Sequence, residues 1–193
     1  MMIVIAICAY LLGSVPFGIV MAKVFGLGDL RAIGSGNIGA TNVLRTGNKL
    51  AAFLTLIGDA GKGAFAVILA RLLVGEEAAP LAGLCAVLGH MFPIFLGFKG
   101  GKAVATFLGT MLVLSFPVGV AACATWLLVA AALRYSSLAG LLSAAMAPIY
   151  ALFFYDLRGA LFIAVMAALI WFKHRGNIAR LRARTEPRIG QKS

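Results

Sequence analysis

Residues 103–133 read AVATFLGTMLVLSFPVGVAACATWLLVAAAL, an apolar run that is too long for one ordinary membrane-spanning helix. Ser115-Phe116-Pro117 lies in its middle, and proline ends or kinks a helix because it lacks an N–H group and its ring clashes with the preceding turn. The run is therefore either one kinked helix or two short spans that meet at a tight turn at Pro117.

The positive charges choose between these alternatives, because cytoplasmic loops of membrane proteins are enriched in Lys and Arg. With two spans, one side of the membrane carries every loop cation except Arg158. These cations are Lys23, Arg31, Arg45, Lys49, Lys99, Lys102, Arg134, Lys173, Arg175, Arg180, Arg182, Arg184, Arg188 and Lys192. With one span, the loop cations divide almost evenly. We therefore predict two spans, of which the first, Ala103 to about Ser115, is short and either tilted or matched by a locally thinner bilayer.

Other apolar segments extend this pattern on both sides. They are Met1 to about Ala22, Ala51–Val74, Ala79–Phe98, about Ser137–Phe154 and Leu157–Phe172. The sequence thus predicts an all-α, polytopic membrane protein with seven transmembrane helices, its N-terminus outside and its C-terminus cytoplasmic. We expect one domain over residues 1–193, with a basic cytoplasmic tail from about residue 173. Gly13 and Pro16 are expected to kink the first helix.

Composition supports the membrane class and limits the chemistry. Of 193 residues, 62% are hydrophobic and 12% charged, with a net charge of +11. Because these cations gather beside apolar spans, we expect anionic lipid or a phosphorylated ligand as partner, and no nucleic acid. The cysteines stand singly, and the six acids (Asp29, Asp59, Glu76, Glu77, Asp156 and Glu186) are scattered. Neither pattern predicts a metal site, and no cofactor is expected.

The longest polar stretch, Gly34–Arg45 (GSGNIGATNVLR), predicts an anion-binding loop. Its glycines allow close approach to a ligand, and its polar side chains supply hydrogen bonds. The candidate binding residues are Ser35, Gly36, Asn37, Thr41, Asn42 and Arg45. The glycine spacing also matches the dinucleotide-binding fingerprint, but that motif requires a strand before it and a membrane helix precedes it here. A flexible turn between two spans is the alternative.

Two further segments fall on the same side in this topology. Lys99-Gly100-Gly101-Lys102 leads into a helix expected to start near Ala103, whose free N–H groups can bind an anion. His174, Arg175, Gly176 and Asn177 follow the last span, and Ser137 can add a hydroxyl. The alternative for Lys99 is a basic side chain that reaches lipid headgroups.

Two intramembrane features are expected to be structural or to support the site. Asp59 and Lys62 lie three residues apart on one helix face, a spacing typical of an ion pair within a membrane, although Lys62 can also face a ligand. His90 is expected to be a packed, hydrogen-bonded residue. Arg71 is expected to extend toward the outer interface, and the arginines of the tail toward anionic lipid.

Long motifs in this chain resemble those of the bacterial membrane acyl-phosphate:glycerol-3-phosphate acyltransferases. They are residues 34–45 (GSGNIGATNVLR), 89–106 (GHMFPIFLGFKGGKAVAT) and 174–181 (HRGNIARL), with weaker support from residues 11–17 and from Asp59-x-x-Lys62-Gly63. Ala103 and Arg184 stand where members of the family typically have glycine; we expect the alanine to be harmless at a first helical position.

The resemblance implies transfer of a fatty acyl group from acyl phosphate to the sn-1 hydroxyl of glycerol 3-phosphate in the cell inner membrane, with the site toward the cytoplasm. Neither acyl carrier protein nor coenzyme A is then required. Ser35 with the backbone of Gly36 and Asn37 would hold the acyl phosphate, and Arg45 and Lys102 would stabilise charge on the leaving phosphate. The acceptor would be oriented by His174 and Asn177. The proton of the attacking hydroxyl goes either to His174 or to the substrate's own phosphate.

Two other classes of protein fit parts of the sequence. A transporter or channel for an organic phosphate would also need helices and a cationic pocket, but its pocket must be reachable from both faces. A scaffold that binds anionic lipid would explain the basic tail but not Gly34–Arg45. No His-x4-Asp pair and no Gly-x-Ser-x-Gly elbow is present, so an enzyme of this sequence would need an activated substrate.

Overall fold

The computed structural model describes residues 1–191, which form helices joined by short turns and loops. The elements follow in chain order: α1 (Met2–Gly13), α2 (Phe17–Val24), η1 (Leu30–Ala32), α3 (Ala40–Leu44), α4 (Lys49–Leu73), η2 (Glu76–Ala78), α5 (Ala79–Met91), η3 (Ile94–Leu96), α6 (Val104–Leu114), α7 (Phe116–Leu133), α8 (Ser136–Phe154), α9 (Leu157–Lys173) and α10 (Arg175–Arg182). The predicted all-helical class is confirmed for the described residues. Lys192, one of the predicted loop cations, lies outside them.

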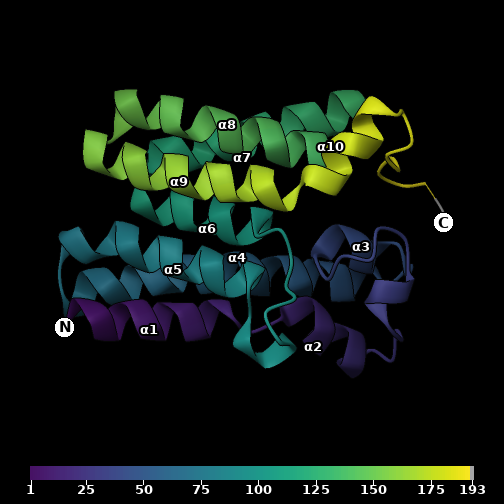
Figure 1. The fold of residues 1–193 in the computed structure, drawn as a ribbon, viewed down its shortest axis with the longest axis horizontal. Helices are drawn as coiled ribbons and strands as arrows, with labels where there is room; N and C mark the ends of the chain where they lie inside the picture. The colour runs from purple at the N-terminus through teal and green to yellow at the C-terminus, as the bar shows by residue number, and fades with distance from the viewer. Residues whose placement is uncertain (192–193) are drawn as a thin grey trace.

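The long helices run side by side in two groups. In Figure 1, α1, α4 and α5 form the lower group, α7, α8 and α9 form the upper group, and α6 lies between them. Helix α6 packs on both α4 and α7, so it connects the two groups. The small residues of this chain make close packing possible. A Cβ on Gly109 of α6 would collide with the backbone of Ala60 on α4, so glycine is needed there for the two helices to approach.

Five helical segments are long and apolar enough to cross a membrane, and a sixth is added if α9 and α10 count as one bent span. The first of the five is α1 with α2, which the chain breaks at Ser14–Pro16, close to the predicted kink. Helix α6 has 11 residues, about 16 Å at 1.5 Å per residue, or about half of a hydrocarbon core. Each of the seven predicted segments contains a helix, although the third ends at Met91 rather than at Phe98 and is followed by the short turn η3. The number of crossings and their orientation stay predictions.

The run of residues 103–133 forms two helices that turn at Ser115. A Cβ on Gly119 of α7 would meet the backbone of Leu112 on α6, so the chain folds back on itself rather than continuing as one kinked rod. Pro117 stands in the first turn of α7, where its missing N–H has no intrahelical role. Arg71 was expected only to extend toward the interface. Instead it donates to the carbonyls of Val113 and Leu114 at the end of α6 and pairs with Glu76.

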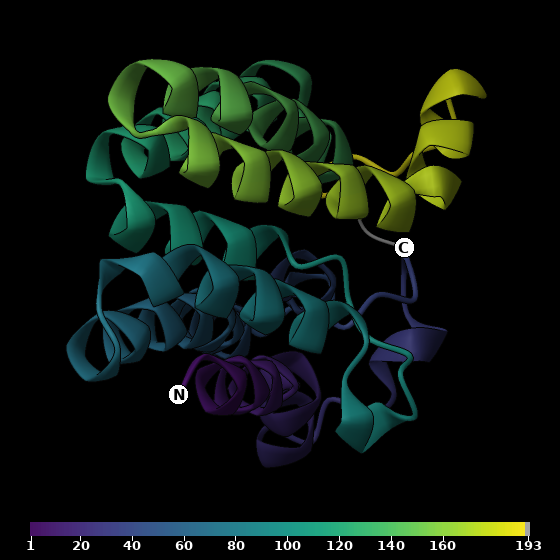
Figure 2. The ribbon, with the colours of Figure 1, turned by 60° about the vertical axis from the view of Figure 1, so that its left-hand side comes forward.

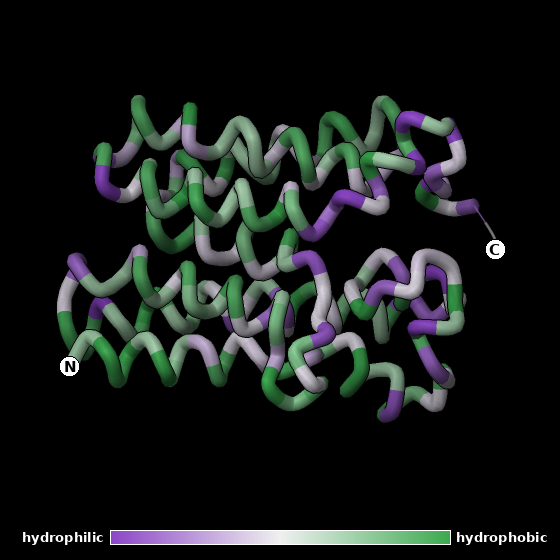
Figure 3. The backbone as a smooth tube through the Cα atoms, viewed as in Figure 1, coloured by the Kyte–Doolittle hydropathy of each residue, from purple (hydrophilic) through white to green (hydrophobic). Residues whose placement is uncertain are grey.

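Polar loops gather at one end of the bundle. Figure 3 shows hydrophilic segments concentrated at the end that holds α3, α10 and the C-terminal tail, while the helices are mostly hydrophobic. Figure 2 shows α10 turning away from the direction of α9. The bend between the two helices is 60°. The segments that the sequence placed on one side therefore lie at one end of the molecule.

The sequence places Ala103 at the first position of a helix, and this expectation is wrong. Ala103 is the N-cap of α6 with φ 60° and ψ 16°, in the left-handed region that glycine adopts without a steric penalty. We expect Ala103→Gly to raise the free energy of unfolding by about 0.5–1 kcal/mol, because relief of strain outweighs the added freedom of the unfolded chain. Denaturant unfolding of the purified protein measures this. Ala105→Gly, inside α6, is the control and should change stability in the opposite direction, by about 1 kcal/mol.

Candidate active site

A cavity of about 420 Å³ opens where the polar loops meet the helices. Its polar wall brings together residues that are far apart in the sequence. They are Ser35, Asn37, Thr41, Asn42, Arg45, Asp59, His90, Lys102, Ser136, Ser137, His174, Asn177 and Glu186. The convergence of three sequence segments on one pocket, which the sequence predicted, is therefore observed. Gly36, Lys62, Lys99, Gly100 and Gly101 do not line this cavity.

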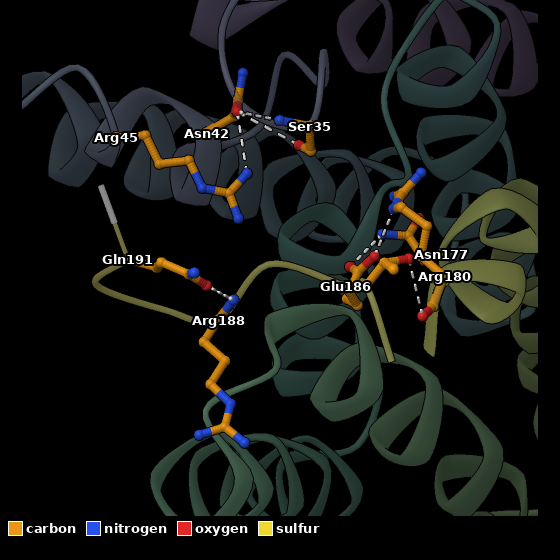
Figure 4. Close-up of polar contacts among 9 residues, drawn as sticks. Ser35, Asn42, Arg45, Asn177, Arg180, Glu186, Arg188 and Gln191 are labelled. Atoms are coloured by element: carbon orange, nitrogen blue, oxygen red, sulfur yellow. Dashed lines mark hydrogen bonds and ion pairs between the residues drawn. The ribbon is translucent and has the colours of Figure 1, made fainter. Parts of the chain in front are cut away.

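Asn42 organises the loop that contains Ser35 and Arg45. Its side-chain oxygen accepts from the backbone N–H of Ser35 (3.1 Å), from the Ser35 hydroxyl (3.4 Å) and from Nη1 of Arg45 (3.3 Å), as Figure 4 shows. Its Nδ2 donates to the carbonyl of Leu30 at 2.8 Å. Asn42 is 2% exposed, and these bonds use its polar groups. We therefore interpret Asn42 as a positioning residue for Ser35 and Arg45 rather than as a direct ligand of substrate.

Lys102 presents a cation to the cavity without a partner. Its ammonium makes no hydrogen bond and no ion pair with any residue of 1–191. Burial lowers its pKa from 10.5 to about 8; Glu186 acts in the opposite direction, and Arg180 and Arg45 lower it further. A bound anion would restore the full charge, so this is an electrostatic arrangement suited to a phosphate.

His174 ends α9 and lies 2% exposed against the cavity. Its Nδ1 lies 2.7 Å from the carbonyl of Ile170, and since a carbonyl only accepts, Nδ1 carries the proton and donates it. Nε2 is then the unprotonated nitrogen. Burial lowers the pKa of His174 to about 4, against the effect of the Ile170 bond, and the positive charge of Lys102 lowers it further. At neutral pH the ring is therefore an uncharged hydrogen-bond acceptor.

Glu186 is a site residue that the sequence did not single out. It comes from the tail, is 8% exposed, and accepts from Nδ2 of Asn177 (2.6 Å) and from Nε of Arg180 (2.7 Å), as Figure 4 shows. Burial raises the pKa of this carboxyl, but the hydrogen bonds from Asn177 and Arg180 and the positive charge of Arg180 together hold it below its ordinary value. Arg180 was expected to face lipid, and this ion pair corrects that expectation. The only sequence signal was a single acid in a basic tail.

Two hydroxyl groups complete the polar wall. The Oγ of Ser137 is buried and has no hydrogen-bond partner of good geometry among the described residues, so it can serve a ligand. Thr41 is less available, because its Oγ1 and the Oγ of Ser136 lie 3.0 Å apart in a hydrogen bond that joins α3 to α8. Ser137 therefore stays a candidate for substrate binding, whereas Thr41 also holds the wall together.

Asp59, which borders the cavity, forms a buried ion pair with Lys62, which does not line it. Lys62 Nζ lies 2.8 Å from Asp59 Oδ1 and also donates to the carbonyl of Val15 at 2.7 Å. Nδ1 of His90 lies 3.4 Å from the same carboxylate oxygen and 3.2 Å from Thr106 Oγ1. Both side chains of the pair are almost inaccessible. The structure thus favours the self-neutralising pair over a substrate-binding role for Lys62.

Gly100 and Gly101 do not offer free N–H groups to a ligand, which corrects their assignment to substrate binding, although the N-terminus of α6 does border the cavity through Ala103, Val104 and Ala105. The N–H groups of the two glycines donate to the carbonyls of Met91 and His90, at 3.2 and 3.1 Å, and so satisfy the end of α5. A Cβ on Gly101 would collide with the His90 ring. Lys99 is exposed, and its carbonyl accepts from Arg31 at 3.0 Å. In this segment Lys102 alone contributes a side-chain cation to the cavity.

The other wall of the cavity is apolar. It is formed by α4, α6 and α7, through Leu56, Ile57, Ala60, Leu108, Gly109, Leu112, Cys123, Trp126 and Leu127. Leu56, Ile57 and Leu127 are 45%, 53% and 61% exposed, so this apolar part of the cavity, its apolar limb, borders the outside of the bundle. A cavity that is cationic at one end and apolar toward the membrane-facing side fits an amphipathic ligand.

Comparison with known proteins agrees with this geometry. Residues 3–184 match the family model described as glycerol-3-phosphate acyltransferase. A glycerol-3-phosphate acyltransferase of Jannaschia sp. is 64% identical over 188 residues, which is 97% of this chain and 93% of the relative. The enzyme of the same description from Dinoroseobacter shibae is 60% identical, with the same coverage.

Solved structures extend the likeness to the fold. The crystal structure of PlsY, an integral membrane glycerol 3-phosphate acyltransferase, in its glycerol 3-phosphate form is 40% identical with a TM-score of 0.92, and the match covers 98% of this chain and 96% of that one. Its lysophosphatidic acid form is 39% identical with a TM-score of 0.90, covering 98% and 95%. On its sequence, its fold and its cavity, this chain belongs to the glycerol-3-phosphate acyltransferase family of integral membrane proteins.

Proposed function

We propose that this chain transfers the acyl group of a fatty acyl phosphate to the sn-1 hydroxyl of glycerol 3-phosphate, giving lysophosphatidate and inorganic phosphate. The observation that carries the proposal is one cavity with a cationic polar wall and an apolar limb. Membership of the family supports an acyltransferase that acts on glycerol 3-phosphate. The use of acyl phosphate as the donor is our inference. In this proposal, no acyl carrier protein and no coenzyme A take part.

The polar wall can hold two phosphates close together. Arg45 and Lys102 come from different loops and line the same cavity. Two phosphate groups repel each other, and fixed cations in a partly dry site offset that repulsion. We assign Arg45 and Lys102 to the phosphate that departs, and His174, Asn177 and Ser137 to glycerol 3-phosphate.

Ser35 is assigned to the head of the acyl phosphate as a hydrogen-bond donor. Among the described residues its hydroxyl bonds to Asn42, which is not a base, so the serine is not activated for attack. The acyl phosphate is a mixed anhydride with a good leaving group, and correct positioning of the acceptor hydroxyl can suffice. The hydroxyl oxygen forms the new ester bond as the bond from the acyl carbon to the phosphate oxygen breaks.

The hydroxyl proton is best accepted by phosphate rather than by His174. A phosphate monoester has its second pKa near 6, whereas the pKa of His174 is about 4 and Lys102 stands nearby. His174 would therefore orient the attacking hydroxyl through Nε2 without taking its proton. The proton would end on a phosphate oxygen, which balances the reaction without another base.

This division of roles predicts the behaviour of His174 variants. We expect His174→Ala to lower kcat/KM about a hundredfold and His174→Gln, whose side-chain oxygen still accepts a hydrogen bond, to recover about tenfold of that loss. In both variants, the profile of kcat/KM against pH from 5 to 8 should still change near pH 6, because that change reports the titration of the substrate phosphate. We call this part of the profile its limb near 6. Equal loss in both variants, with disappearance of the limb, would identify His174 as the base instead.

Phosphate release by the purified protein with palmitoyl phosphate, measured together with lysophosphatidate, tests the reaction itself. We expect release to require glycerol 3-phosphate and to match lysophosphatidate mole for mole. Palmitoyl-coenzyme A in a parallel assay should give no product. Acceptor-independent release would indicate an acyl-enzyme, and product from the thioester alone would overturn the proposed donor.

We further propose that the polar end of the bundle faces the cytoplasm of a bacterial inner membrane. The concentration of cationic loops at that end supports this orientation through the positive-inside rule. Reaction of single introduced cysteines with a membrane-impermeant reagent in intact cells tests it. A cysteine at position 158 should react, and one at position 49 should not.

A further inference from the structure

A second hollow, of about 600 Å³, lies beside the catalytic cavity. It is formed by the turn between α7 and α8 and by the C-terminal tail. The residues around it are Arg134, Tyr135, Arg184, Thr185, Glu186, Pro187, Arg188 and Gln191. Of these, Glu186 and Pro187 also line the catalytic cavity, while Arg45, Lys102 and His174 do not line the second hollow.

The tail is fixed in place around this hollow. The N–H of Ile189 donates to the carbonyl of Arg134 at 2.7 Å, and Nη2 of Arg134 donates back to the carbonyl of Ile189 at 3.0 Å. The guanidinium of Arg188 lies 5.4 Å from the centre of the Tyr135 ring, and its Nε donates to the Tyr135 hydroxyl at 3.3 Å. Figure 4 shows Arg188 on the tail, together with Gln191, whose side-chain oxygen accepts from the Arg188 N–H. The hollow is therefore formed before any ligand arrives.

The hollow is rich in unneutralised positive charge. Its cations are Arg134, Arg184 and Arg188, and its single acid, Glu186, is already bonded to Asn177 and Arg180. The exposed side chain of Arg184 makes no hydrogen bond or ion pair with the described residues. Guanidinium groups bind phosphate through paired, charge-assisted hydrogen bonds, and they keep their charge at all physiological pH values.

Two of these arginines occupy backbone positions that favour glycine. Arg134 has φ 60° and Arg184 has φ 58°, and both line the same hollow. Both residues end a helix in this way. The N–H of Arg134 donates to the carbonyl of Ala130 at the end of α7, and after α10 the N–H of Arg184 donates to the carbonyl of Leu181 while that of Thr185 donates to the carbonyl of Arg180. These helix caps hold the backbone of both arginines in place beside the hollow.

We propose that this hollow is a phosphate-binding site separate from the catalytic cavity, with Arg134, Arg184 and Arg188 as its cations. The recognised chemistry is a phosphate group, either free in solution or in the headgroup of an anionic phospholipid. Glu186 and Pro187 line both the hollow and the catalytic cavity, so the proposed site lies directly beside the hydrogen bond between Glu186 and Asn177.

Hydrogen–deuterium exchange of the segment 184–191 tests the proposal on the full-length protein. One arm adds inorganic phosphate to protein in an uncharged detergent, and the other compares nanodiscs of phosphatidylcholine alone with nanodiscs that also contain phosphatidylglycerol. We expect exchange to slow by about threefold or more in at least one arm. In Arg184→Gly the concentration needed for half the effect should rise about tenfold, because one charge-assisted contact is lost.

Arg182→Ala is the matched control, because it removes one exposed arginine of the same tail without touching the hollow. It should change that concentration by less than about twofold, and Arg184→Lys should fall between the two. Protection by inorganic phosphate identifies a soluble phosphate as the source, and protection only by phosphatidylglycerol identifies a headgroup. No protection in either arm, or equal effects of Arg184→Gly and Arg182→Ala, would overturn the proposal. Arg188→Gln provides a second variant that does not depend on the backbone at position 184.

Discussion

Replacing Lys102 by alanine is expected to lower kcat/KM by about a thousandfold, which makes it one of the most damaging single changes in the cavity. Lys102 is the cation that lines the cavity without a partner among residues 1–191, and its charge would act on a phosphate that gains charge as it departs. Loss of one such group in a partly dry site typically costs a hundredfold to a thousandfold. Steady-state kinetics with palmitoyl phosphate and glycerol 3-phosphate measure the effect.

The pKa of Lys102 adds a pH signature to this prediction. With a pKa of about 8, the side chain is charged below pH 8 and loses its charge as the pH rises through that value. The kcat/KM of the unliganded wild-type enzyme should therefore fall above about pH 8. Lys102→Arg should keep part of the activity and lose this alkaline limb, because the guanidinium stays charged. An unchanged limb in that variant would assign it to another group.

Lys99→Ala is the matched comparison, because Lys99 is three residues earlier in the same loop but is exposed and outside the cavity. We expect its kcat/KM to stay within about threefold of wild type. A loss as large as that of Lys102→Ala would support the broader substrate-binding assignment that the sequence predicted for both lysines.

Breaking the Asp59–Lys62 pair is expected to destabilise the protein by about 3–5 kcal/mol. Lys62→Met leaves a carboxylate buried without its 2.8 Å partner, and Asp59→Asn leaves a buried ammonium. The double variant Asp59→Asn with Lys62→Met removes both charges at similar volume and should recover most of the loss. Unfolding in denaturant, in the same detergent for all four proteins, measures the coupling in a double-mutant cycle.

The same variants separate a structural role from substrate binding at Lys62. If the pair is structural, stability falls in both single variants and returns in the double variant. A Lys62→Met protein of full stability with a strongly reduced kcat/KM would instead show that Lys62 contacts substrate. Additive losses in the double variant would mean that the two charges do not stabilise each other.

Patterns local in the chain determined much of this protein. Continuous apolar runs predicted the helices, because burial of apolar surface and internal pairing of N–H and C=O groups are satisfied within each segment. Ser115-Phe116-Pro117 predicted a kink or a turn near Pro117, because proline acts on its own turn, and the loop cations favoured two helices; the observed break lies at Ser115. The long motifs identified the family and predicted that residues near Ser35, Lys102 and His174 share one site.

Contacts between distant residues decided the rest. Gly100 and Gly101 looked like an anion loop, but their N–H groups bond to the end of α5, which no local pattern indicates. The carboxylate of Glu186 reaches Asn177 and Arg180 only because the tail folds back beside α10. The left-handed backbone at Ala103 follows from the path of the loop into α6. A residue's type and spacing thus determine which helix it belongs to and which chemical groups it carries. The packing of the helices determines whether those polar groups bond to other residues of the protein or stay free to bind a ligand.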